Sequence, residues 1–349
     1  MFSMSRVRNL LIVAMPVAAA LFSPPASAQS STESFYSGKR LHFIVGSRPG
    51  GGYDTYARSL VPFLTKHLPG HPNMIVENRP GGGGLLSSNH LYNIAAKDGL
   101  VIGMLERGAQ MEPLLNPKDT NALFDPRKFN WIGTPSQEIG LAMVRTSTPI
   151  KTFEDFKTHE VLVSATTRTG LASIYPRLMN SVFGTKFKVI EGYKSSSEML
   201  LAVERGEVDG HIAPSSAGTL RATIAPWIAE GKVKIVMQIG LEKDPAYPQA
   251  AMFTDYITKQ EDKELFLLMF SQQRMAFPVA APPGVPADRV AALRAAFDKT
   301  MQDPEYAATL EKINFSVDAV SGVEIHKLLD EVYKTPQSVI ERYKQMTAE

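Results

Sequence analysis

Apolar and polar residues alternate along the chain in a pattern that predicts two α/β units. In the first unit, apolar runs at 41–45, 74–76 and 101–104 predict short strands. The stretches between them have helical spacing, and helices are expected over 53–67 and 85–96. Strands that alternate with helices are typical of a parallel sheet with helices on its faces.

The same alternation returns after a looser, proline-containing stretch at 112–130. Further apolar runs predict the strands 141–144, 161–163, 187–189, 208–212 and 233–237, and the segments between them predict the helices 171–183, 195–205 and 216–229. Ser195 and Glu198 form the S-x-x-E capping box that opens a helix. The last hundred residues are expected to be mostly helical and to pack back onto an earlier sheet.

The N-terminus has the layout of a secretory signal peptide. Arg6 and Arg8 precede an apolar run at 10–22, and small residues at 26–28 form a cleavage site. We therefore expect residues 1–28 to be removed by cleavage near Ala28–Gln29 and the mature chain to lie in the periplasm. A membrane anchor is the competing interpretation, but the run is shorter than the roughly 20 residues that span a bilayer. The polar residues 29–34 are expected to form a flexible leader.

Composition and charge exclude several classes of protein. Without Arg6 and Arg8 the 37 basic residues fall to 35, which equals the number of acidic residues, so a nucleic-acid partner is not expected. The chain has no cysteine, which excludes disulfides and thiol catalysis. The seven histidines form no H-E-x-x-H motif, and there is no G-x-S-x-G. We therefore expect neither a catalytic metal, nor a cofactor, nor enzyme activity.

A glycine-rich turn at 46–55 is the sharpest candidate site. It lies between a predicted strand and a helix N-terminus, whose free N–H groups and partial positive charge attract a carboxylate or a phosphate. A Walker A phosphate loop is excluded because no G-K-[S/T] follows. From the turn alone, an anion site and an ordinary tight turn both stay open. Asp54 is expected to occupy the helix N-cap rather than to transfer protons.

Arginines and hydroxyls follow other predicted strands. Arg107 comes after the strand 101–104, and the segment from Thr166 through Arg168 to Gly170 comes after the strand 161–163. Ligands of open α/β sheets lie beyond the carboxyl ends of the strands, so both arginines are candidate partners of an anion. Taken singly, each arginine is more commonly a surface ion-pair residue. The glycines at 81–84 allow a second close approach to backbone N–H groups.

A series of short motifs along the chain carries a resemblance to a known family. The motifs, in order, are P-G-G-G-Y-D-T at 49–55, V-E-N-R-P-G-G-G-G at 76–84, K-D-G at 97–99, F-D-P at 124–126, V-D-G at 208–210 and P-P-G-V-P-A-D-R-V at 282–290. With the signal sequence, this order resembles the substrate-binding proteins of tripartite tricarboxylate transporters, the Bug receptors. The resemblance implies a periplasmic-binding-protein type II-like α/β fold with two lobes, a hinge crossed twice and a ligand in the interlobe cleft. We assign residues 29–138 and 242–349 to lobe 1 and residues 139–241 to lobe 2.

The resemblance also implies a function. It predicts a monomeric receptor that captures a small organic carboxylate and delivers it to membrane permease subunits, and the two arginines favour a dicarboxylate. The predicted ligand contacts are Ser47, Gly50, Gly51, Gly52, Tyr53, Asp54, Thr55, Arg107, Thr166, Arg168, Thr169, Gly170 and Tyr193. The alternatives are a ligand-sensing module for a membrane kinase and a secreted hydrolase. Ser47, Arg48 and Arg107 depart from the residues usual in the family, so the ligand's identity stays open.

Overall fold

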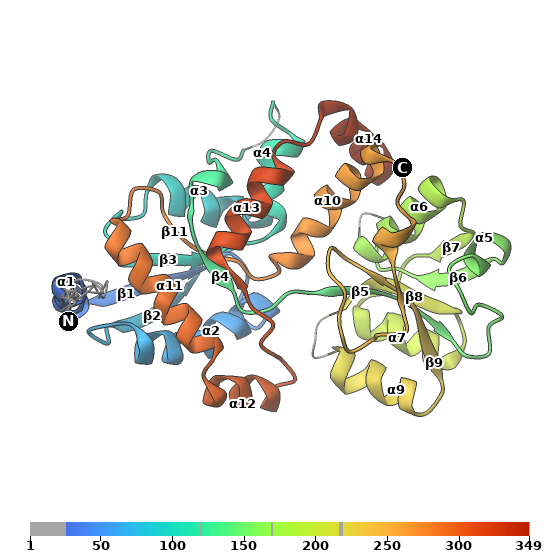
Figure 1. The fold of residues 1–349 in the computed structure, drawn as a ribbon, viewed down its shortest axis with the longest axis horizontal. Coiled ribbons are helices and arrows are strands. Elements are labelled where there is room, and N and C mark those ends of the chain that lie inside the picture. The colour runs from blue at the N-terminus through green and yellow to red at the C-terminus, as the bar shows by residue number, and fades with distance from the viewer. Residues whose placement is uncertain (1–25, 119–120, 169, 216–218, 349) are drawn as a thin grey trace, which may run out of the picture.

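The computed structural model describes residues 26–118, 121–168, 170–215 and 219–348 (Figure 1). The predicted signal peptide lies outside this range, apart from its last three residues. The expectation of a flexible leader at 29–34 is wrong, because these residues belong to helix α1 (Ala26–Tyr36). Tyr36 ends this helix fully buried, and its hydroxyl donates to the Gly99 carbonyl over 3.2 Å. In the part of the chain described, no helix is both long and apolar enough to cross a membrane.

The first lobe is built on a six-stranded mixed sheet with the order β12-β4-β11-β3-β1-β2. Its strands are β1 (Arg40–Val45), β2 (Asn73–Asn78), β3 (Val101–Met104), β4 (Asn130–Thr134), β11 (Val279–Ala281) and β12 (Val320–Ser321). β1 lies between β2 and β3 and is parallel to both, whereas β11 and β12 are antiparallel to their neighbours. The predicted parallel unit is therefore present and is extended by strands from the C-terminal part of the chain.

Helices of the first lobe pack around this sheet through their apolar residues. They are α2 (Gly52–His67), α3 (Leu85–Asn93), α4 (Glu112–Leu115), α11 (Ala287–Met301), α12 (Pro304–Lys312) and α13 (Gly322–Val332). In α2, Ala57, Leu60 and Leu64 are buried in one core with residues of β1 and α11. The C-terminal helices α11 and α13 thus pack on the first sheet, as the sequence predicted.

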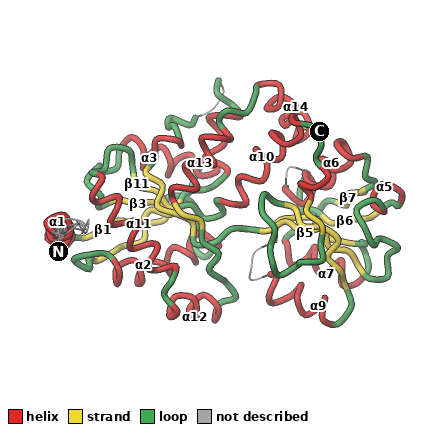
Figure 2. The backbone as a smooth tube through the Cα atoms, viewed as in Figure 1, coloured by secondary structure: helices red, strands yellow, loops and turns green. Residues whose placement is uncertain are grey.

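The second lobe holds another six-stranded mixed sheet, with the order β10-β9-β5-β8-β6-β7. Its elements are β5 (Ile139–Arg145), α5 (Asp155–Thr158), β6 (Val161–Ser164), α6 (Leu171–Phe183), β7 (Phe187–Ile190), α7 (Ser196–Arg205), β8 (Gly210–Ser215), α9 (Ala225–Ala229), β9 (Val233–Ile239) and β10 (Ala251–Met252). Ser195 is the N-cap of α7, as predicted, and its side chain accepts a hydrogen bond from the Glu198 N–H. The two lobes lie side by side, and the segment between β4 and β5 connects them (Figure 2).

The lobe boundary after residue 241 does not agree with sheet membership. β10 pairs with β9 in the second sheet, although the predicted boundary placed it in lobe 1. Helix α10 (Gln260–Arg274) buries Leu265 and Phe266 in the core of the second lobe, and Val339 of α14 (Gln337–Ala348) joins the same core. We propose that the chain returns to the first lobe after α10, between Arg274 and Val279.

Candidate functional site

Three loops of the first lobe meet because the strands before them are parallel neighbours. The loops follow the carboxyl ends of β1, β2 and β3. The Gly46 N–H donates to the Met104 carbonyl over 3.0 Å, and the Arg79 N–H donates to the Val45 carbonyl over 2.8 Å. Parallel pairing therefore brings the glycine-rich turn at 46–55, the glycines at 81–84 and the segment Glu106–Arg107 to one edge of the sheet.

The start of α2 presents backbone N–H groups without a side-chain cap. Gly51 is the N-cap, and no described side chain hydrogen-bonds there. Gly50 has a positive φ of 84°, which favours glycine, and Gly50, Gly51 and Gly52 are exposed. An N-terminus of this kind carries unsatisfied donors and a partial positive charge, so it is suited to a carboxylate.

Asp54 has a different place in the helix from the one predicted. It was expected at the N-cap, but Gly51 occupies that position and Asp54 is the third residue of α2. Its buried carboxylate accepts hydrogen bonds from the Gly50 N–H (2.9 Å), from Asn78 Nδ2 (2.8 Å) and from Arg58 Nε (2.9 Å). Burial opposes ionisation, but these hydrogen bonds hold the pKa of Asp54 below its ordinary value. Asp54 thus holds the glycine turn in place as a fixed anion.

The second glycine loop has a backbone conformation that favours glycine at all four positions. Gly81, Gly82, Gly83 and Gly84 all have positive φ, between 56° and 147°. A Cβ added to Gly84 would lie 2.3 Å from the Cβ of Glu106, so this loop and the one after β3 are in direct contact. Close packing of loop on loop therefore accounts for Gly84.

Two residues of the first turn face inward. The Oγ of Ser47 is buried and has no hydrogen-bond partner among the described residues. The Tyr53 hydroxyl accepts a hydrogen bond from the Arg107 N–H over 3.2 Å, and the Tyr53 ring packs edge-on against Phe277. Burial raises the pKa of Tyr53, so its hydroxyl stays neutral. Thr55 is half-buried, and its N–H donates to the Gly51 carbonyl inside the helix.

Arg107 is already engaged in an ion pair. Its Nη1 lies 2.7 Å from Oε2 of Glu138, and both side chains are about four-fifths buried. Burial would lower the pKa of Arg107, but the Glu138 carboxylate raises it above its ordinary value. Arg107 lies beside the glycine-rich turn at 46–55, and Glu138 compensates its charge there.

The predicted contacts of the second lobe lie on the loop after β6. Thr166 is half-buried, Arg168 is exposed, and Gly170 is the N-cap of α6. The Tyr193 N–H donates to the Ala165 carbonyl and the Gly192 N–H to that of Thr166, so Tyr193 adjoins the same loop. Thr169 lies outside the described residues. These contacts and those of the first lobe form two separate groups, one on each lobe.

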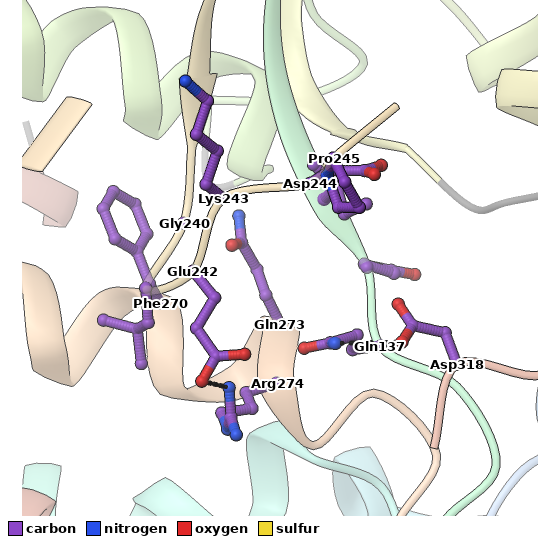
Figure 3. A pocket seen from close by; sticks show the side chains of 13 residues that line it. Gln137, Gly240, Glu242, Lys243, Asp244, Pro245, Phe270, Gln273, Arg274 and Asp318 are labelled. Carbon is purple, nitrogen blue, oxygen red and sulfur yellow. Dashed lines mark hydrogen bonds and ion pairs between the residues drawn. The ribbon is translucent and has the colours of Figure 1, made fainter. Parts of the chain in front are cut away.

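A hollow of about 340 Å³ lies at the hinge (Figure 3). It is lined by residues 137–139 of the segment between β4 and β5, by the loop 240–245, by the end of α10 and by Asp318. The described part of the predicted site contributes no lining residue. Glu138 and Gln273 do line it, and the sequence analysis missed both, since no local motif marks them. Glu138 adjoins a predicted lobe boundary, whereas Gln273 has no sequence signal.

Metal binding finds no support in the described part of the chain, where no group of three or more His, Asp or Glu side chains could hold an ion. The arrangement instead offers a charge-attracting helix start, buried hydroxyls and a compensated arginine.

The family model of the tripartite tricarboxylate transporter family receptor, TctC, matches residues 57–344, which is most of the chain. The chain belongs to this receptor family. It is therefore a solute-binding receptor and not an enzyme, as the motifs indicated. A Cupriavidus necator relative, described as "UPF0065 protein in gbd 5′ region", is 26% identical over 95% of this chain and 94% of its own.

Solved structures show the receptor's fold. A TctC solute-binding protein from Polaromonas, solved without ligand, has a TM-score of 0.68 at 18% identity and covers 90% of this chain and 99% of its own. MatC from Rhodopseudomonas palustris, solved with bound malate, has a TM-score of 0.52 at 20% identity and covers 88% of this chain and 99% of its own. The predicted α/β fold of the periplasmic-binding-protein type II kind is confirmed.

Proposed function

We propose that this receptor captures a small organic carboxylate between its lobes in the periplasm and delivers it to a tripartite tricarboxylate-type permease. The observation that carries the proposal is the uncapped N-terminus of α2, exposed in a glycine turn that Asp54 holds in place. Such a site meets a carboxylate with backbone N–H groups and a helix dipole. The malate bound to MatC supports the same ligand chemistry.

The ligand's first carboxylate binds at Gly50–Thr55. Ser47, whose buried hydroxyl has no hydrogen-bond partner among the described residues, supplies a further donor. The ligand's far end meets Arg107 and the second-lobe contacts Thr166–Gly170 and Tyr193. Closure of the lobes removes water and strengthens these hydrogen bonds. The prediction of a dicarboxylate depends on Arg107 and Arg168 and stays a prediction.

Replacement of one N–H group tests the proposed carboxylate site. Gly52 is the first residue of α2, where proline is well tolerated, and the extended backbone of Gly51 (φ −85°, ψ 175°) suits a residue before proline. Gly52→Pro therefore removes a donor and leaves the helix intact. Gly52→Ala is the matched control, because it keeps the N–H and its Cβ meets Phe277 at no less than 3.4 Å.

Calorimetry with a panel of mono- and dicarboxylates is the measurement. We expect micromolar binding of at least one acid by the wild type and about a tenfold weaker affinity in Gly52→Pro than in Gly52→Ala, from the loss of one charge-assisted hydrogen bond. Equal affinities in the two variants would contradict the carboxylate site. Loss of uptake of the bound acid in a strain lacking the receptor separates transport from sensing.

A further inference from the structure

The ion pair between Arg107 and Glu138 joins the two lobes at the hinge. Arg107 follows β3 of the first lobe, and Glu138 immediately precedes β5 of the second. Arg107 Nη1 and Glu138 Oε2 are 2.7 Å apart, and the two side chains are only 20% and 16% exposed. An ion pair this far from water keeps its charges close together, because neither is well solvated by itself.

This pair adjoins the proposed ligand site on one side and the second lobe on the other. The Arg107 N–H donates to the hydroxyl of Tyr53, the second residue of α2. On the other side, the Glu138 N–H donates to the Gln273 carbonyl over 3.0 Å, and Gln273 Nε2 donates to the Tyr175 hydroxyl over 2.8 Å. Groups of both lobes therefore fix the pair in position.

The guanidinium still has donors to offer a ligand, although its charge is compensated. It carries five N–H groups, and Glu138 is its only ion-pair partner in the described part of the chain. Its buried Nη1 makes no well-aligned hydrogen bond with a described residue, despite the nearby carboxylate. The side chain next to Arg107 in the sequence, Glu106, is a carboxyl group whose pKa burial raises, so it adds no positive charge either. This end of the cleft thus provides hydrogen bonds without net positive charge.

We propose that Glu138 is a specificity-determining residue that, by compensating Arg107, makes the cleft accept a carboxylate with an uncharged hydrogen-bonding far end as well as the matching dicarboxylate. The proposal rests on the proposed function and adds to its dicarboxylates those acids whose far end is a hydroxyl, an amide or a carbonyl. Arg107 donates to that group, and Glu138 acts through Arg107 as a positioning residue.

Matched ligand pairs test this charge selectivity by calorimetry. Succinate and glutarate are each compared with their monoamides, succinamate and glutaramate, which have nearly the same shape and one charge less. In the wild type we expect the affinities within each pair to agree within about threefold. The measured quantity is the ratio of the diacid's affinity to the monoamide's affinity. In Glu138→Gln this ratio should be about tenfold higher than in the wild type, because the arginine has lost one nearby negative charge.

Glu160→Gln is the control variant. Glu160 is exposed, and its carboxylate lies 4.0 Å from the Lys188 ammonium. It precedes β6, at the opposite end of the strand from the proposed ligand contacts Thr166–Gly170. It should leave both ratios unchanged. Thermal unfolding verifies that each variant is folded. If Glu138→Gln does not fold, the double variant Arg107→Gln/Glu138→Gln, which buries neither charge, should keep the wild-type ratio. An arginine that selects dianions would instead make that ratio fall.

Two results overturn the proposal: a wild-type preference for the diacid above tenfold, or a folded Glu138→Gln variant with an unchanged ratio. Both outcomes leave carboxylate capture itself standing. A wild type that binds no acid of the broader panel refutes the proposed function instead, so the two failures are distinguishable.

Discussion

Asp54 offers the most direct test of how the ligand turn is held. Asp54→Asn keeps the size of the side chain and one acceptor oxygen, but it places an amide NH₂ where Oδ2 accepts from the Gly50 N–H over 2.9 Å. Two donors then face each other, or the amide turns and loses Asn78 instead. In either orientation the variant loses one hydrogen bond to a buried carboxylate that is 4% exposed.

The size of the effect follows from the surroundings of each partner. Hydrogen bonds to a charged group contribute about 1.5–3 kcal/mol. The Arg58 pair counts for little because the Arg58 side chain is 51% exposed. We therefore expect Asp54→Asn to lower the free energy of unfolding by about 2 kcal/mol. The folded pKa is depressed, so this stability is complete at neutral pH, and the difference from the variant narrows as the pH falls below about 4.

Urea unfolding and calorimetry with the best-bound acid measure the two consequences together. Asp54→Asn should lose stability and also bind more weakly, because the turn at Gly50 is no longer fixed. Asp155→Asn is the matched control: Asp155 accepts the N–H groups of Lys151 and Thr152 in the second lobe, away from the proposed contacts. It should lose stability and keep its affinity. If Asp54→Asn matches the wild type within 0.5 kcal/mol and binds equally well, the assigned role of Asp54 is wrong.

Three further variants test the packing of the two lobes. Burial lowers the pKa of His211 from 6.5 to about 4, so the unfolded chain takes up a proton at a higher pH than the folded chain does. As the pH falls from 7 to 4, the free energy of unfolding of the wild type should therefore drop by about 3 kcal/mol relative to that of His211→Leu. Stability curves that stay parallel over this pH range would exclude this. Gly84→Ala should cost more than about 2 kcal/mol in urea unfolding, because it adds a clash with Glu106 to the strain of a positive φ. Gly184→Ala, with a φ of 70° and open space around it, should cost about 1 kcal/mol, and equal losses would contradict the clash.

Local patterns predicted the elements that carry their own signals. The strand at 101–104 and the helix 171–183 have the predicted bounds, because apolar spacing and flanking glycines mark them. β10 was missed because two residues are too few for a period, and its pairing with β9 depends on the tertiary fold. The same reason explains the early lobe boundary at 241.

In the candidate site, too, features with a local sequence signal were predictable and features that depend on the tertiary fold were not. The glycine turn was predictable because a strand, glycines and a helix start are consecutive in the sequence. The position of Asp54 within α2 was not, since an Asp at the N-cap and an Asp at the third position of a helix give the same local pattern. Glu138 carries no signal of its own. It becomes part of the site only because the fold brings Arg107, which is distant in sequence, within 2.7 Å.

The way charge is arranged suits a receptor that must also release its ligand. In the proposed complex, the ligand's carboxylate meets backbone dipoles at the start of α2, and its far end meets an arginine that is already ion-paired with Glu138. Dipolar groups attract an anion strongly only when water is excluded, so we infer that affinity depends on lobe closure more than on fixed charge. A permease that holds the lobes apart would then weaken binding without competing for any ligand contact. An uncompensated arginine would keep the anion bound even in the open form, and we infer that the ion pair with Glu138 prevents this.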